Sequence, residues 1–393
     1  MHFHSLHENP FVFPNDMHPA WSIMIVLYPY ITGMVAGSFI VSTLYHVFHR
    51  TELRPVARLA VVTSLCFCAC ATMPLLLHLH QPLRALNVVA TPSPTSAMAG
   101  FGFIYSFYML LLLVDVWLLF RPSIVERART RTGLAGLAYK ALALGVVEVT
   151  PRAAAIDHRL VGVLSIVGIP AACILHGYVG FLFGAIKANP WWSSSLMPVI
   201  FISSAIVSGI AVLVLLYMFL CRWSRIPPDD ACMRSLAQQL WRFLVLAVAF
   251  ESLDLLHVAY EREEEWHLIR ELLATKLHFS FFTLQVLIGS VVPLVLLPIA
   301  AFTSWFDAAF RRSCMLVASV LVLVQVLAMR WNVVVGGQSF SKSFRGFVEY
   351  PVTWWGREGL LAAGVVLAMP LLLLFGICRV LPVWPPERPA GEA

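Results

Sequence analysis

The chain has 393 residues, of which 60% are hydrophobic and only 12% are Asp, Glu, Lys or Arg. Soluble domains carry about 25% charged residues, and the mean hydropathy here is +0.81, so water is excluded as the main solvent of the fold. The net charge of +6 is spread over short connecting segments, without the soluble basic face that nucleic-acid binding requires.

The first twenty residues are polar and rich in histidine, with no basic stretch ahead of an apolar one. A cleavable secretory signal needs that basic stretch. We therefore expect residues 1–20 to form a polar segment outside the membrane and the first apolar helix to be retained as a signal-anchor. His2, His4 and His7 lie close together here, but their spacing matches no defined zinc geometry, which favours a solvated terminus.

Beyond residue 20 the chain consists of continuous apolar runs of about 20 residues or more, the length that crosses a bilayer as an α-helix. A membrane barrel would instead show short segments of alternating hydrophobicity, so we expect an all-α integral membrane protein. The pattern predicts a transmembrane domain over residues 21–385 and a cytoplasmic tail over 386–393. The nine expected spans are 21–48, 55–79, 97–120, 160–184, 196–221, 237–259, 277–301, 309–330 and 358–381.

Basic residues are distributed unequally between the two sets of loops that nine spans create. Placing the N-terminus outside puts most loop arginines and lysines on the inner side, where they face anionic lipid. Fewer fall in the outer segments, Arg330 and Arg357 among them, and the outer stretch 261–273 is acidic. The positive-inside rule therefore predicts an outer N-terminus and an inner C-terminus.

Eight cysteines raise the question of iron–sulfur ligation. Cys66, Cys68 and Cys70 lie inside an apolar run, and the other five are scattered. Cluster ligands need closely spaced cysteines on a loop that can wrap the cluster, whereas residues two apart on a helix point away from each other. These cysteines are therefore interpreted as small apolar residues.

Polar side chains at membrane depth are costly, and each is a functional candidate. Here they concentrate toward the outer ends of the second, fourth and sixth spans. A quinone needs an apolar cleft, a donor to each carbonyl and a proton-exchanging group, and histidine beside a carboxylate suits the last role. The candidates for quinone binding or proton transfer are His78, His80, Arg84, Tyr105, Tyr108 and His176; those for a proton path are Asp115, Glu251, Asp254 and His257.

Simpler interpretations stand beside these. A histidine in a membrane helix is more often an interhelical hydrogen-bond partner than a reactive group, and His46 and His278 are interpreted in that way. Glu251 and Asp254 serve either a structural role or a proton path. Asp115 lies near the inner end of its span, within reach of the aqueous phase.

Three segments resemble the NrfD/PsrC family of polysulfide reductase-type membrane subunits. The first is LLLHLHQPLRALNVVATPSPTSAMAGFGFIYSFYMLLLL, and the second and most specific is HGYVGFLFGAIKANPWWSSSLMPVIFISSAIVSG over 176–209. The third, RWNVVVGGQSFSKSFRGFVEY over 330–350, is similar to the HybB-like hydrogenase subunits of the same family. Together the matches span most of residues 20–385.

The resemblance implies two four-helix bundles plus one extra helix, in the cytoplasmic membrane of a prokaryote. It implies exchangeable menaquinone or ubiquinone near the outer face and no haem or iron–sulfur cluster within this chain. The implied partners are a four-cluster ferredoxin-like iron–sulfur subunit and a catalytic subunit with molybdopterin, nickel–iron or multihaem chemistry. It supports His78, His80, Arg84 and His176 as site residues. The chain departs from the family in two places: His78 stands where many relatives have Asp, and WSIMIVLYPYITG has no clear match to the family's Asn and His quinone contacts on the first helix.

Two other classes of protein remain open on the residues alone. A dihaem cytochrome b anchor needs facing histidine pairs at two depths, and the inner half offers few besides His46. A secondary transporter carries broken helices around a midplane site. Pro170, Pro293 and Pro298 would break helices, but the polar groups lie toward one side.

Overall fold

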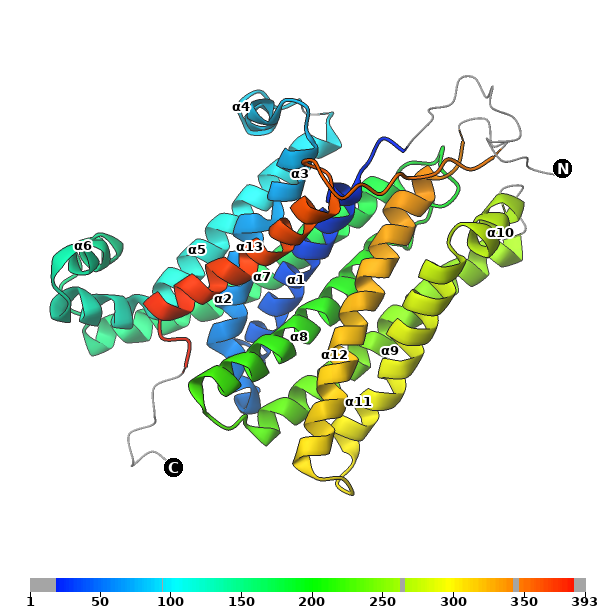
Figure 1. Ribbon diagram of the computed structural model, residues 1–393. Helices are drawn as coiled ribbons and strands as arrows, with labels where there is room; N and C mark the ends of the chain where they lie inside the picture. Colours follow the sequence, from blue (N-terminus) through cyan, green and yellow to red (C-terminus); the bar gives the residue numbers. More distant parts are fainter. Residues whose placement is uncertain (1–18, 94, 262–265, 342–345, 385–393) are drawn as a thin grey trace.

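The computed structural model describes residues 19–93, 95–261, 266–341 and 346–384, and every regular element within them is a helix (Figure 1). Nine helical stretches in this part of the chain are long and apolar enough to cross a membrane. The helices are α1 (Ile23–His46), α2 (Arg54–Ala71), α3 (Met73–His78), α4 (Asn87–Ala90), α5 (Ala97–Thr130), α6 (Gly133–Leu142), α7 (Pro151–Gly184), α8 (Met197–Ser224), α9 (Asp230–Glu261), α10 (Trp266–Thr275), α11 (Val292–Phe302), α12 (Ala308–Trp331) and α13 (Leu360–Val380). Two short 3₁₀ turns, η1 (Thr51–Leu53) and η2 (Pro82–Leu86), and two π-helical segments, η3 (His278–Val291) and η4 (Asn332–Gly336), complete the set.

Local sequence signals set several helix starts. The side chains of Ser22, Ser96, Thr150 and Asp307 each accept a hydrogen bond from a backbone N–H in the first turn of the helix that follows. Such caps satisfy donors that have no partner inside the helix. The second span is broken, because α2 ends at Ala71 and α3 restarts with Pro74 in its first turn.

The spans alternate in direction, so their ends gather at two opposite ends of the molecule (Figure 1). At the upper end in Figure 1, α1, α5, α8 and α13 begin and α3, α7 and α12 end; the α8–α9 and α11–α12 connections lie at the lower end, and α6 lies at the left edge of the view, on the same side of the spans as these connections. Helix α1 packs against α2, α7 and α8, and α12 packs against α8, α11 and η3. The most apolar part of α1 is 83% buried and that of α9 only 11%, so α1 is central and α9 presents much of its surface outward.

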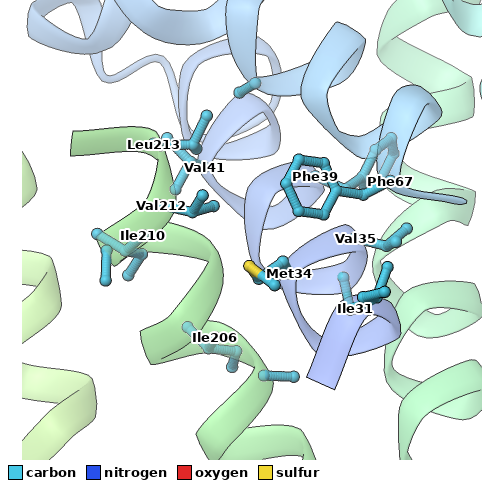
Figure 2. Packing of buried hydrophobic residues seen from close by; sticks show 14 of the residues in the cluster. Ile31, Met34, Val35, Phe39, Val41, Phe67, Ile206, Ile210, Val212 and Leu213 are labelled. Carbon is cyan, nitrogen blue, oxygen red and sulfur yellow. The ribbon is translucent and has the colours of Figure 1, made fainter. Parts of the chain in front are cut away.

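The crossing of α1 and α8 forms the centre of the core. Met34 of α1 lies on the side of Ile206 and Ile210 of α8, whereas Phe39 lies on the other side of α1, beside Phe67 of α2 (Figure 2). The two backbones approach so closely that a Cβ added at Gly209 would collide with the backbone of Gly37, and one added at Gly37 would collide with the Ala205 carbonyl oxygen. Small residues permit such close packing between membrane helices, where no hydrophobic effect holds the helices together.

The nine expected spans coincide with the nine found in the described residues, but four boundaries were placed wrongly, among them the start of the sixth span, since α9 begins at Asp230, seven residues before 237. Helix α5 continues ten residues beyond 120 and α7 begins nine residues before 160. The added turns stay helical because Arg121 of α5 donates to Asp157 of α7 at 2.8 Å, which pairs their charges. The eighth span continues past residue 330 to Gly336, so Arg330 belongs to a helix rather than to an outer loop. The two-bundle arrangement and the side of the N-terminus remain predictions.

All eight cysteines are unpaired thiols, and six of them are buried. Cys66, Cys68 and Cys70 pack within α2, as their place in an apolar run predicts. The histidines of residues 2–7 lie outside the described residues.

Candidate functional site

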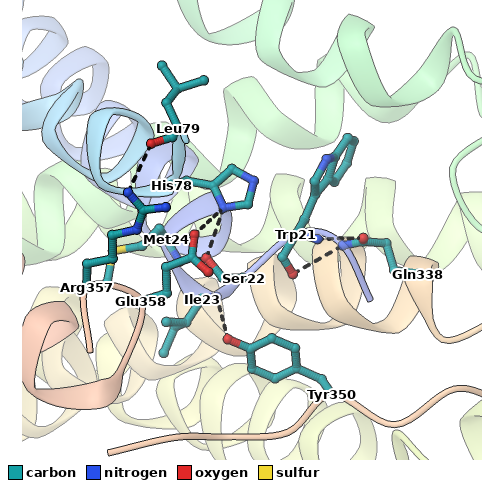
Figure 3. A network of polar contacts seen from close by, with 10 residues as sticks. All are labelled: Trp21, Ser22, Ile23, Met24, His78, Leu79, Gln338, Tyr350, Arg357 and Glu358. Carbon is teal, nitrogen blue, oxygen red and sulfur yellow. Dashed lines mark hydrogen bonds and ion pairs between the residues drawn. The ribbon is translucent and has the colours of Figure 1, made fainter. Parts of the chain in front are cut away.

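At the upper end, three distant segments meet around His78 (Figure 3). Its Nδ1 atom lies 2.8 Å from Oε1 of Glu358 and 3.3 Å from the Ser22 hydroxyl. His78 is the last residue of α3, Ser22 caps α1, and Glu358 shortly precedes α13. Arg357 donates to the Leu79 carbonyl at 3.4 Å, which ties the segment before α13 to the end of α3.

The His78–Glu358 pair is partly exposed at the molecular surface. The side chains of His78 and Glu358 are 20% and 37% exposed. The hydrogen-bonded imidazole and carboxylate therefore lie at the ends of the helices and are partly exposed at the molecular surface. One nitrogen is engaged with the carboxylate, which orients the ring and leaves the other nitrogen available. Such a pair can accept a proton on one side and release it on the other.

The start of α1 is fixed by contacts that surround this pair. The Ile23 N–H donates to the Tyr350 hydroxyl at 3.0 Å, and the Trp21 N–H donates to Gln338 Oε1 at 2.8 Å (Figure 3). Burial raises the pKa of the Tyr350 phenol, so this side chain stays protonated and neutral at physiological pH. The Trp21 ring stacks on that of Trp192, with centroids 5.1 Å apart.

Two other polar residues of the segment HLHQPLR, which covers residues 78–84, lie away from this pair. His80 and Arg84 are exposed, before and within η2, and no side chain of η2 is buried. The structure therefore separates His78, which has a carboxylate partner, from His80 and Arg84, which lie on the surface. Glu358 was missed from the sequence because it lies 280 residues from His78.

A cavity of about 560 Å³ opens at the same end, between the 92–97 loop, the first turns of α5 and the last turns of α7. Tyr178 closes one side by donating to the Ala97 carbonyl at 2.9 Å, and Gly100 leaves room for that ring, since a Cβ there would lie 2.6 Å from the Tyr178 hydroxyl. Phe103 and Phe181 add aromatic surface. The volume is in the range of small-molecule sites, and none of the ten predicted residues lines it.

His176 belongs to a second network, deep in the core. Its Nε2 atom lies 3.0 Å from Nη2 of Arg330, which also donates to the Ser204 hydroxyl at 2.6 Å. The guanidinium lies over the Phe201 ring, 3.7 Å from its centroid. Both His176 and Arg330 are 0% exposed.

The contact with Arg330 fixes the state of the imidazole. A guanidinium only donates hydrogen bonds, so Nε2 of His176 accepts and the ring hydrogen resides on Nδ1. Within the described residues that Nδ1 atom has no hydrogen-bond partner. The ring lies beside Gly33 of α1, where an added Cβ would be 3.4 Å from Cε1. His176 is thus a neutral imidazole whose Nδ1–H has no acceptor among the described residues.

Glu251 is at the centre of a third network. It accepts from Gln285 Nε2 at 2.9 Å and from Gln325 Nε2 at 3.1 Å. Asn332 extends this network by donating to Gln285 Oε1 at 2.8 Å, and it accepts from the Ser280 hydroxyl at 2.6 Å. Gln285 and Ser280 lie in η3 and Asn332 opens η4. Both π-helical segments thus supply this network, as π-helical turns often do at functional sites.

Two further ionisable residues lie near Glu251 on α9. Asp254, one turn beyond Glu251, accepts from the Ser194 hydroxyl, and His257, a further turn on, is exposed. Glu251 and Asp254 therefore share a helix face but have different partners.

The three candidates on α5 lie apart from these networks. The Tyr105 hydroxyl donates to the Cys68 carbonyl, and Tyr108 is fully buried with its ring edge against Phe39. Asp115 is 1% exposed, and neither carboxyl oxygen has a hydrogen-bond partner in the part of the chain that the structure describes. The expectation that Asp115 reaches the aqueous phase was wrong, because α5 continues for fifteen residues beyond it.

The sequence motifs around 176–209 and 330–350 pack against each other. Trp191 and Trp192 donate to the carbonyls of Asn332 at 2.9 Å and Val333 at 2.6 Å, and Asn189 donates to the Gly337 carbonyl at 2.6 Å. The side chains of one motif thus bind the wide π-helical backbone of the other. Both motifs also supply the core network, through His176 and Ser204 on one side and Arg330 on the other.

The described residues combine nine apolar spans, polar networks in the core and a partly exposed His–Glu pair at one end, which together define an integral membrane protein. Residues 12–342 match the family model described as "Polysulphide reductase, NrfD". The chain belongs to this family.

Named relatives cover most of the chain. A subunit of the selenate reductase of Mesobacillus selenatarsenatis is 28% identical, over 94% of this chain and 88% of that protein. Protein NrfD of Escherichia coli is 25% identical, over 81% of this chain and 95% of that protein. The Hdr-like menaquinol oxidoreductase integral membrane subunit of Archaeoglobus fulgidus is 24% identical, over 82% of this chain and 72% of that protein.

Proposed function

We propose that this chain is the quinone-handling membrane anchor subunit of a respiratory oxidoreductase complex. Its relatives include a subunit of a selenate reductase and the integral membrane subunit of a menaquinol oxidoreductase. Menaquinone or ubiquinone would exchange electrons at the upper end with an extrinsic iron–sulfur subunit, which in turn serves a catalytic subunit. This end would face the outside of a prokaryotic cytoplasmic membrane.

The observation that carries this proposal is the His78–Glu358 pair, with Nδ1 and Oε1 2.8 Å apart and both side chains partly exposed. Conversion of a quinone to a quinol takes two electrons and two protons, and the reverse reaction releases them. The partner's cluster would supply or receive the electrons. The imidazole would donate a proton from Nε2 to a quinone oxygen and take one up at Nδ1 from the Glu358 carboxyl group, which would be reprotonated from water; two such transfers would supply both protons of the quinol.

The cavity beside Tyr178 supports the same proposal. It has about 560 Å³ of space, aromatic walls and an opening at the upper end, which suits the first part of the tail of a quinone; because His78 does not line this cavity, the ring would lie outside it, at His78. His78 and Glu358 would then act at the same membrane end as this cavity (Figure 1).

Proton movement through the core is a further part of the proposal. Glu251 would be the proton-carrying group of the third network, and the carboxamides of Gln285 and Asn332, hydrogen-bonded in series with it, would orient its carboxyl group. Glutamate within a membrane span is a residue type that serves in proton relays. Asp254 and His257 lie nearer the upper end of α9 and would connect this series to the surface, whereas Asp115 has no such connection to it.

The decisive experiment is the rate of reaction of the purified complex with a soluble quinone analogue. His78→Gln and Glu358→Gln are each expected to lower this rate about tenfold or more, because general acid–base groups typically contribute 10²–10⁴-fold. His158→Gln is the matched control, since His158 is an exposed histidine at the opposite end, near the start of α7. Unchanged rates in both site variants would overturn the assignment of His78 and Glu358.

Three further measurements test the remaining parts. Mass spectrometry of copurified proteins is expected to find an iron–sulfur subunit, and its absence from an active preparation would refute the partner assignment. A haem band in the reduced-minus-oxidised optical spectrum of this chain would favour the dihaem anchor instead. Substrate uptake by proteoliposomes that contain this chain alone would favour the transporter.

A further inference from the structure

A cavity of about 550 Å³ lies at the lower end, far from the His78 network. Three separate segments enclose it: the beginning of α2, the last turns of α5 and residues 382–384 that follow α13. Figure 1 shows α13 ending beside the turn from α5 to α6. Arg127 and Tyr139 close this side, since both donate to the Val380 carbonyl at the end of α13.

The lining of this cavity is strongly basic. Arg58, Arg127 and Arg131 contribute three guanidinium groups, and Glu126 contributes the single carboxylate of the lining. Arg58 is half-buried over the Phe120 ring, 5.5 Å from its centroid. The Arg58 and Arg131 side chains form no hydrogen bond or ion pair with any described residue. Two cations therefore face this cavity without an ion-pair partner in the described part of the chain.

Tryptophans gather at the end of the spans where this cavity lies. Trp384 lines it, and Trp117 and Trp223 lie at the same end of the spans. Tryptophan is enriched where the hydrocarbon core meets water. Above the cavity, α5 and α13 present exposed apolar side chains toward the surroundings, among them Leu113 of α5 and Leu372 of α13. An anionic headgroup placed here would have apolar helix surface available for its acyl chains.

We propose that this cavity binds the phosphate headgroup of an anionic phospholipid. Guanidinium groups donate paired hydrogen bonds to phosphate oxygens, and basic pockets between transmembrane helices on the cytoplasmic side are suited to such headgroups. The hydroxyls of Ser123 and Thr130 also line the cavity and would donate to the remaining headgroup oxygens. The lipid would join α2, α5 and the segment after α13, which lie far apart in the sequence.

The test uses native mass spectrometry of the purified full-length chain with its partner subunits, after exchange into detergent with defined lipids. At equal mole fractions, phosphatidylglycerol is expected to remain bound in preference to phosphatidylcholine. The double variant Arg58→Gln/Arg131→Gln is expected to lose about tenfold or more in apparent affinity for phosphatidylglycerol, given the contribution of each basic residue near a membrane surface.

The matched control is Arg129→Gln/Arg152→Gln, which removes the same charge from exposed positions near this end but outside the cavity. It is expected to retain phosphatidylglycerol as the parent does. An equal loss in both double variants, or no preference between the two lipids, would overturn the proposal. Displacement of phosphatidylglycerol by millimolar inorganic phosphate would overturn the lipid assignment in favour of a free anion.

Discussion

Replacement of Glu251 tests whether the third network stabilises the packing of α9, α12 and η3. In Glu251→Ala, the Nε2 donors of Gln285 and Gln325 lose their shared acceptor at once. A buried donor without an acceptor costs about 1–3 kcal/mol, and an interhelical hydrogen bond in a membrane contributes about 0.6 kcal/mol on average. The two donors together therefore give an expected loss of roughly 2–4 kcal/mol in the free energy of unfolding.

Glu251→Gln separates hydrogen bonding from charge. Its amide oxygen can accept from Gln285, and its NH₂ group can donate to Gln325 after that side chain turns, because Gln325 Oε1 has no partner among the described residues. We expect this variant to lose less than half of what Glu251→Ala loses, because it keeps an acceptor for Gln285 and a partner for Gln325. Equilibrium unfolding in mixed detergent micelles measures both losses. Gln238→Ala, on the same helix with one 3.4 Å bond, is the control. Equal losses for Ala and Gln would refute the hydrogen-bond account.

Three other substitutions give sharp expectations in the same unfolding assay. Ser204→Ala removes the 2.6 Å acceptor of a buried guanidinium and is expected to cost about 1.5–3 kcal/mol, as for hydrogen bonds to charged groups; a neutral effect would contradict the role given to the serine. Gly209→Val places side-chain atoms against the α1 backbone and is expected to cost about 1–3 kcal/mol or more, whereas Gly364→Val, with nothing within 4 Å of its added Cβ, is expected to cost far less. Asp157→Asn breaks the ion pair with Arg121 at 2.8 Å and is expected to lower stability, and adding Arg121→Gln should recover part of that loss; additive losses would show that the pair is not coupled.

The fold was predictable from the sequence because membrane spans are set by length and hydropathy. A run of about 20 apolar residues must satisfy its own backbone hydrogen bonds in lipid, so the spans could be found without tertiary information. The ends of the long helices were harder to predict. Arg121 and Asp157 appeared to be loop residues because each is charged, and only their contact with each other shows that they remain helical.

Arg330 shows the same difficulty within the site. A cation after an apolar run resembles the start of an outer loop, and the helix was expected to end there. The structure shows that His176, Ser204 and Phe201 together receive the guanidinium, and these partners come from two other helices. His176, Glu251 and Asp254 were found as candidates because each is polar in an apolar run. The uncharged partners Gln285, Gln325 and Asn332 were missed because only ionisable and aromatic side chains were selected, and only positions in space join these amides to Glu251.

Trp192 lies between the His78 network and the Glu251 network. Its ring stacks on Trp21, the neighbour of Ser22 in the His78 network, while its indole N–H holds the carbonyl of Val333, the neighbour of Asn332 in the Glu251 network. One side chain therefore contacts both the segment that caps α1 beside the surface pair and the turn that supplies Asn332 to the buried series. The bulk of a single indole thus sets the spacing between these two segments, which lie more than 300 residues apart in the sequence.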